Sequence, residues 1–245
     1  MSFTAAQARD AMEHFPIVPL AGLLRRGLPV VAPHPDDESL GCGGLIAACR
    51  AASVPVRIVA VSDGAGSHPA SRAFPPARLA ALRRSEMLAA ADQLGVAASD
   101  VDFIDLPDRA VPEAGPEAAR AVEAIVAAAA GADAIAVTWH HDPHCDHKAS
   151  VALARAAAVR LPGVRLWEYP IWGLALPDDT VLEGALPQGV RVDVGAHLGA
   201  KRRAVYAHAS QCSALIADDP AGFRLQPAML ARFTGRYEIL IEANS

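Results

Sequence analysis

Short apolar runs rich in β-branched residues alternate with alanine-rich stretches along most of this chain. The apolar runs occupy 28–32, 56–62, 101–106, 134–139 and 164–169. The segments between them carry helix-forming residues with apolar side chains every three to four positions, near 40–52, 77–94, 114–130 and 147–160. Strands that are apolar on both faces belong in a parallel sheet covered by helices. The alternation therefore predicts an α/β fold, a Rossmann-like three-layer sandwich around a mostly parallel sheet.

The last quarter of the chain is less regular. Its sequence is compatible with a strand at 189–195, a helix at 196–210 and a final strand at 235–242. No linker rich in serine, glycine or charge divides the 245 residues, which are enough to bury a sizeable core. We therefore expect a single domain spanning 1–245.

The composition of the chain indicates which class of molecule it binds. Hydrophobic residues make up 52% of the chain and charged residues 20%, and the formal net charge is −5. No basic field is present for nucleic acid, so a small-molecule substrate is the expected partner, and the oligomeric state stays open. The four cysteines have wide, irregular spacings that fit neither a C-x-x-C zinc site nor a secreted disulfide framework.

The location that we expect is the cytoplasm, with reduced thiols. Arg9 and Asp10 stand where the apolar core of an export signal would lie. The most apolar run, 121–137, contains Glu123 and Asp133 and is too short and too charged to span a bilayer. It reads as a helix, a turn and a strand.

Polar residues gather just after the predicted strands. The segments are PHPDDES, DGAGSHPAS, PDRAVP, HHDPHCDH and PIWG, one after each of the five runs. Ligands of parallel α/β sheets bind at the carboxyl ends of the strands, so these loops are expected to converge on one rim.

Two of these loops carry metal-binding side-chain types. His34 and Asp37 are three residues apart where the first strand gives way to a helix. The fourth loop holds four of the nine histidines, together with Asp142 and Asp146, in the segment 139–150. Imidazole and carboxylate are ordinary ligands of zinc and ferrous iron. The two clusters together would supply two histidines and one carboxylate, with positions left open for water and substrate.

The run Asp36, Asp37 and Glu38 invites a simpler interpretation. Adjacent acids at a helix N-terminus can cap free N–H groups and meet the positive end of the helix dipole. Asp146 could start the next helix in the same way. Because both clusters fall at the same predicted edge, a cation that holds Asp37 is the preferred explanation.

Two motifs of the chain resemble the signatures of a known family. APHPDDESLGCGG and HCDHKAS resemble the A-H-P-D-D-E and H-x-D-H signatures of the PIG-L/LmbE-like metal-dependent N-acetylglucosaminyl de-N-acetylases. Weaker similarity covers SDGAGSHP, RRSEMLAAADQLGV, DLPD and KRRAVYAHASQ, and so most of the chain. Pro33 stands where alanine is usual.

The resemblance implies a role for each signature residue. The metal ligands would be His34, Asp37 and His147, holding zinc or possibly ferrous iron. Asp36 would be the general base, and His144 the electrophilic or acidic histidine, steadied by Asp146. Glu38 is expected to bond loop or helix backbone groups.

The resemblance also implies that the elements carrying Arg83 and Asp108 contact the sugar. Their neighbours Arg84 and Arg109 are equally compatible with that role. Further candidates for the pocket wall are His68, Trp172 and Tyr169, although a buried aromatic after a strand is more often part of the core. Three residues are assigned no ligand role: His140, His141 and Cys145.

The implied activity is removal of an N-acetyl group from an N-acetylglucosamine-like sugar on a small molecule or glycoconjugate. One rival is a non-haem iron oxygenase, which also uses two histidines and one carboxylate. Its usual spacing of two residues on a β-sandwich strand differs from the spacing of His34 and Asp37. A second rival is a non-catalytic sugar- or nucleotide-binding module that uses DGAGS, which lacks the full G-x-G-x-x-G pattern.

Overall fold

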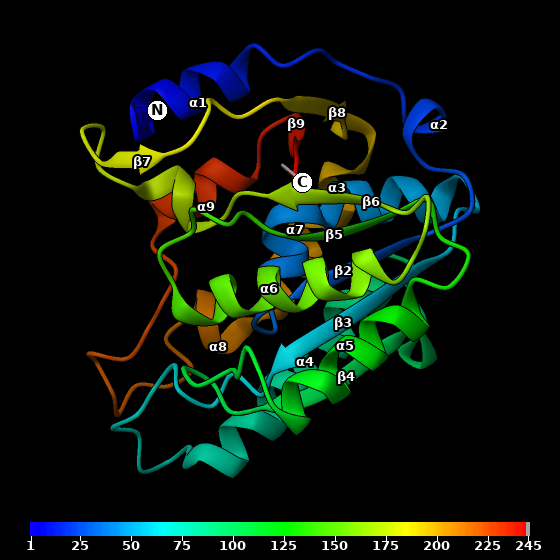
Figure 1. Cartoon of the computed structure of the whole chain (residues 1–245). Helices are drawn as coiled ribbons and strands as arrows, with labels where there is room; N and C mark the ends of the chain where they lie inside the picture. Colours follow the sequence, from blue (N-terminus) through cyan, green and yellow to red (C-terminus); the bar gives the residue numbers. More distant parts are fainter. Residues whose placement is uncertain (244–245) are drawn as a thin grey trace.

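A seven-stranded sheet forms the centre of the computed structural model, which describes residues 1–243 (Figure 1). The strand order is β4-β3-β2-β5-β6-β9-β8, and the first five are parallel. Their bounds are β2 Leu28–Ala32, β3 Val56–Ser62, β4 Val101–Leu106, β5 Ala134–Thr138 and β6 Arg165–Tyr169. Each predicted run is confirmed to within one residue.

The far edge of the sheet is antiparallel. β9 (Tyr237–Glu242) pairs in opposite direction with both β6 and β8 (Gly189–Asp193). The mostly parallel sheet is therefore confirmed, as are the two strands expected near the end of the chain.

Helices cover both faces of the sheet. α3 (Asp37–Ala51), α4 (Pro76–Gln93) and α7 (Leu198–Ala207) lie on one face, and α5 (Pro116–Ala128) and α6 (Cys145–Val159) on the other (Figure 1). The side chains of β2 alternate between two separate cores. Val30 packs with the α3 layer and Val31 with the α5 and α6 layer. This is the predicted three-layer sandwich.

A second, two-stranded sheet joins the start of the chain to a later segment. β1 (Ser2–Thr4) pairs antiparallel with β7 (Val181–Glu183), and α1 (Ala5–Glu13) packs beside them. These elements were not predicted from the sequence. Strands of three residues are too short to show an alternating pattern.

The remaining elements are short. They are α2 Leu20–Leu23, η1 Ala98–Asp100, η2 Trp172–Ala175, η3 Gly195–His197, α8 Ala209–Cys212 and α9 Pro227–Phe233. Within residues 1–243, no helix combines the length and apolar character needed to cross a bilayer.

Candidate active site

The two histidine and aspartate clusters lie where the strand order of the sheet reverses. The chain runs from β2 to β3 and β4 in one direction, and from β5 to β6 in the other. The loops after β2 and β5 are therefore neighbours whose helices leave toward opposite faces, the usual ligand position in such folds. The ring centroids of His34 and His147 are 5.3 Å apart. The predicted meeting of the two clusters is confirmed.

The three adjacent acids point to different partners. Asp36 pairs with Arg83, Asp37 with His34 and His147, and Glu38 with His208. The side chain of Asp36 makes no capping hydrogen bond to α3. Simple capping therefore does not explain the run, because each carboxylate neutralises a separate basic group.

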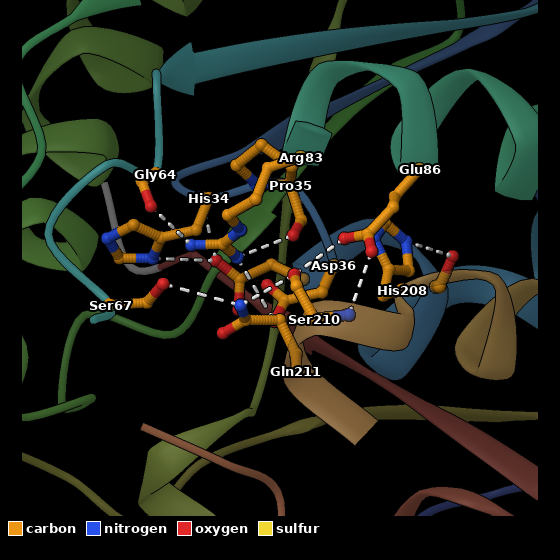
Figure 2. A network of polar contacts seen from close by, with 12 residues as sticks. His34, Pro35, Asp36, Gly64, Ser67, Arg83, Glu86, His208, Ser210 and Gln211 are labelled. Atoms are coloured by element: carbon orange, nitrogen blue, oxygen red, sulfur yellow. Dashed lines mark hydrogen bonds and ion pairs between the residues drawn. The ribbon is translucent and has the colours of Figure 1, made fainter. Parts of the chain in front are cut away.

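Asp36 is held in an uncommon backbone conformation beside Arg83. Its φ is 144°, a value that non-glycine residues adopt rarely and mostly at functional sites. Arg83 Nη2 lies 3.3 Å from the Asp36 carboxylate and donates to Pro35 O at 2.6 Å, while Nη1 donates to Gly64 O at 3.0 Å (Figure 2). Burial raises the pKa of Asp36 to about 6, although Arg83 opposes this. The result is a fixed carboxylate that holds its proton more tightly than an exposed aspartate.

Asp37 lies between the two histidines. Its Oδ2 is 3.2 Å from His34 Nδ1 and 3.3 Å from His147 Nε2. Burial alone would raise the pKa of Asp37, but His147 and His34 hold it well below its usual range. Burial also opposes charge on His147, yet Asp37 and Asp142 raise its pKa to about 9. The environment therefore favours positive charge at this point.

The donor set fits a divalent metal ion. His147 Nε2 is buried and lies 3.3 Å from Asp37 Oδ2 without a well-directed hydrogen bond to it, while its Nδ1 is 2.9 Å from Asp142 Oδ2. A carboxylate behind a histidine is the usual support of a metal ligand, because it fixes the orientation of the ring. Ring nitrogens of His34, His144 and His147 also lie within 4.8 Å of one another. His144 is thus within reach of the same ion, which was not predicted from the sequence.

Asp146 differs from its sequence-based assignment. Its carboxylate accepts from Arg109 N at 2.6 Å and Val111 N at 3.2 Å, and lies 3.1 Å from His34 Nε2. It is the backbone N–H of Asp146, not the carboxylate, that donates to His144 Nδ1, at 3.2 Å. The expected support of His144 by the Asp146 side chain is corrected accordingly. The carboxylate orients His34 instead.

A cavity of about 150 Å³ opens beside these residues. Its wall includes two of the adjacent acids and three of the predicted substrate contacts: Asp36, Asp37, Arg83, Asp108 and Trp172. Arg109 also lines it. Arg84 is partly exposed and pairs with Asp105, so of the two neighbouring arginines Arg83 is the one in the cavity.

Asp108 lines the cavity and also contacts His34. Its Oδ1 is 3.3 Å from His34 Nε2 and its Oδ2 accepts from Gly66 N at 2.8 Å. Burial would raise the pKa of Asp108, but His34 holds it below its usual range. Asp108 therefore supports His34 as well as lining the cavity.

His68 was predicted to line the pocket wall but is not part of it. Its ring is buried against Gly222, where an added Cβ would fall 2.2 Å from a ring carbon, and burial lowers the pKa of His68. The preceding residue, Ser67, lines the cavity instead. Tyr169 belongs to the core, where its hydroxyl donates to Val31 O at 2.8 Å.

A buried network behind the acids was not predicted from the sequence. Glu38 accepts from Asp36 N at 3.0 Å and lies 3.0 Å from His208 Nε2, which confirms the structural role expected for Glu38. Figure 2 shows this network continuing through Ser210, which donates to Glu86, and Gln211, which reaches Ser67. The only signal in the sequence was the segment KRRAVYAHASQ, which supplies His208, Ser210 and Gln211 to the network.

The remaining histidines and cysteine of the second cluster lie outside the cavity wall described above. His140 Nδ1 is 2.5 Å from Glu168 Oε2, and the His141 ring packs 4.0 Å from that of His140. Cys145 is exposed at the start of α6, with its Sγ 3.8 Å from Arg109 O.

Two comparisons with solved structures support the fold. N,N'-diacetylchitobiose deacetylase from Pyrococcus horikoshii is similar with a TM-score of 0.66 and 20% identity, covering 89% of this chain and 83% of that one. The 4-carboxy-2-hydroxymuconate hydratase of Pseudomonas putida KT2440 has a TM-score of 0.58 and 21% identity, covering 76% and 80%. Because these two proteins perform different reactions, the fold by itself does not identify the chemistry.

Sequence comparison is more specific. A 1D-myo-inositol 2-acetamido-2-deoxy-alpha-D-glucopyranoside deacetylase from Nocardia farcinica is 29% identical, covering 76% of this chain and 80% of the relative. The GlcNAc-PI de-N-acetylase family, PIG-L, matches residues 29–158, more than half of the chain. That segment contains both clusters described above. The chain therefore belongs to the PIG-L family of GlcNAc-PI de-N-acetylases.

Proposed function

We propose that this protein is a metal-dependent hydrolase that removes the N-acetyl group from an N-acetylglucosamine-like sugar on a small molecule or glycoconjugate. The observation that carries the proposal is the convergence of His34, Asp37 and His147 on one buried point, with Asp36 beside it in a cavity. Family membership and the deacetylase named among its relatives support the same reaction.

The metal would be held by His34, Asp37 and His147, and zinc suits this set, with ferrous iron as the alternative. Such an ion polarises a carbonyl oxygen and acidifies a neighbouring water. Asp142 behind His147, and Asp108 and Asp146 behind His34, fix the two rings.

Asp36 is proposed to take the proton of the attacking water. It lines the cavity, is buried and is kept in place by Arg83 and by the bond from its own N–H to Glu38. A carboxylate fixed next to the reacting atoms is the type of group that serves as general base.

His144 is proposed to assist the acetyl oxygen or the leaving amine. Its Nδ1 accepts the Asp146 N–H, so in the neutral ring the proton is on Nε2. Burial lowers the pKa of His144, and the nearby His34 and His147 lower it further. A neutral ring that donates through Nε2 supports the electrophilic role, in which charge on the acetyl oxygen is stabilised.

The rival functions gain no support from these comparisons. Neither the family nor the relatives described above is an oxygenase or a non-catalytic binding module. Because a hydratase has the same fold, an activity test must distinguish amide hydrolysis from hydration of a double bond.

Chelation tests the metal dependence. Treatment with a chelator is expected to abolish acetate release from N-acetylglucosaminyl compounds, and zinc or anaerobic ferrous iron to restore it. The assay is run without oxygen and without 2-oxoglutarate, so that restored activity excludes an oxygenase. Full activity in the metal-free protein would contradict the proposal.

His147→Ala is expected to reduce bound metal from about one ion per chain to a small fraction of that, because it removes one of three ligands. Metal analysis of the purified protein after dialysis measures this. His14→Ala is the matched control, since the His14 side chain is 75% exposed on a distant helix end. Unchanged metal in His147→Ala would remove His147 from the ligand set.

A further inference from the structure

A second hollow adjoins the active-site cavity. It has a volume of about 410 Å³ and is lined by Pro143, His144, Trp172, Ala175, Leu176 and Pro177. We refer to this hollow as the apolar groove. His144 and Trp172 line both the groove and the cavity, so the two spaces meet at these side chains.

The chemistry of the groove differs from that of the cavity. The cavity wall carries Asp36, Asp37, Arg83, Asp108 and Arg109, whereas the lining of the groove contains apolar side chains apart from His144. A group with hydroxyls or charge would find few partners there, and an apolar group would be removed from water.

Hydrogen bonds to the backbone hold the segment that forms the groove wall. Asp142, which also supports His147, accepts from Gly173 N at 2.7 Å and Ile171 N at 3.2 Å. Arg9 on α1 donates to Leu176 O at 3.0 Å. A wall held in this way needs little ordering on binding, which favours affinity.

Most of the groove wall lies outside the segment that matches the family. Residues 172–177 come from η2 and the loop after it, beyond the segment 29–158 that matches the family. The contact from Arg9 comes from the N-terminal α1, which also lies outside that segment. Residues 172–177 of the groove wall therefore come from a part of the chain outside the matched segment, while Pro143 and His144, which also line the groove, lie within it.

The size of the cavity indicates what fills the groove. Small-molecule sites usually measure roughly 300–1,000 Å³, more than the cavity of about 150 Å³ provides. A substrate whose acetamido group lies beside Asp36 must continue past the mouth of the cavity. The groove begins at the His144 and Trp172 boundary and offers the adjoining space for that continuation.

We propose that the apolar groove binds the aglycone of the substrate, and that this aglycone is an apolar alkyl or aromatic group. The inference rests on the proposed N-acetyl sugar hydrolysis and specifies the class of sugar derivative that is used. The sugar ring occupies the cavity, and the group attached to it packs on Trp172, Ala175 and Leu176.

The test compares alkyl N-acetylglucosaminides of increasing length with the metal-loaded enzyme. Methyl, butyl and octyl glycosides of both anomers are assayed below their micelle concentrations, with a triethylene glycol glycoside as the polar chain of similar length. We expect kcat/KM to rise by about two- to fourfold per methylene, where the upper figure corresponds to full burial, and the polar chain to give much less.

Ala175→Glu places a charge in the groove, and because Ala175 is exposed the longer side chain needs no repacking. This variant is expected to lose the gain from methyl to butyl. Val159→Glu is the matched control, since Val159 is 86% exposed at the far end of α6, about 20 Å along the helix from Cys145. The control is expected to keep the full gain.

The outcomes separate the two claims. Equal kcat/KM for methyl and butyl glycosides, an equal gain from the polar chain, or a gain that survives in Ala175→Glu would each overturn the groove assignment while the deacetylase stands. Failure to release acetate from any of the methyl, butyl or octyl glycosides would contradict the proposed function, and the substrate class with it.

Discussion

Asp36→Asn is expected to lower kcat/KM for N-acetyl sugar hydrolysis by about 10²- to 10⁴-fold while the protein keeps its metal. Asparagine has nearly the same shape and can still lie beside Arg83, but it does not accept the proton of the attacking water. The measurement is steady-state release of acetate, together with metal analysis of the same preparation.

The companion variant is Asp37→Asn. Because the Asp37 carboxylate contacts both His34 and His147, this change is expected to lower metal content as well as activity. If Asp36→Asn instead loses the metal and Asp37→Asn keeps it, the two adjacent aspartates have been assigned the wrong way round.

His144→Ala is expected to lower kcat and kcat/KM together by about 10²- to 10³-fold, with KM little changed. The reason is that a donor to the acetyl oxygen acts mainly in the transition state, when charge develops there. Full kinetic curves on one N-acetylglucosaminide give both constants. Cys145→Ala serves as the neighbouring control, because Cys145 is exposed and has no proposed role.

Two other results would change the assignment of His144. Loss of metal in His144→Ala would make this residue a fourth ligand, which its position within 4.8 Å of the His34 and His147 nitrogens allows. A higher KM at unchanged kcat would make it a substrate-binding residue. In either case the electrophilic role would have to be abandoned.

The central sheet was predictable because its inner strands are buried on both faces. The inner strands β2 and β5 are almost entirely apolar and buried along their whole length, the strands beside them are mostly apolar, and the helices between them have regular spacing. The small sheet of β1 and β7 was not predictable, because its pairing joins Ser2–Thr4 to Val181–Glu183 through tertiary contacts that leave no local pattern.

The meeting of the two clusters was predictable from one topological rule. Strands that run parallel bring their carboxyl ends to the same edge, so the loops after β2 and β5 were expected on one rim. Their direct adjacency follows from the strand order. The partners of single side chains were not predictable in this way. Asp146 turns its carboxylate to His34 and its N–H to His144, a choice that depends on the local path of the loop.

The buried residues that support the site could not be predicted from the sequence for a related reason. His208 reaches Glu38 from 170 positions further along the chain, and sequence spacing carries no information about such a contact. The alignment of α7 and α8 against α3 and α4 in space decides which polar groups become partners.

The most direct measurement is the stoichiometry of products from an N-acetylglucosaminide incubated with the metal-loaded protein. Acetate and free primary amine are quantified in the same reaction, without oxygen. The proposed function predicts that the two are released in equal amounts and that Asp36→Asn suppresses both. Consumption of the substrate without acetate, or no reaction across a panel of N-acetylglucosaminyl compounds, would contradict it.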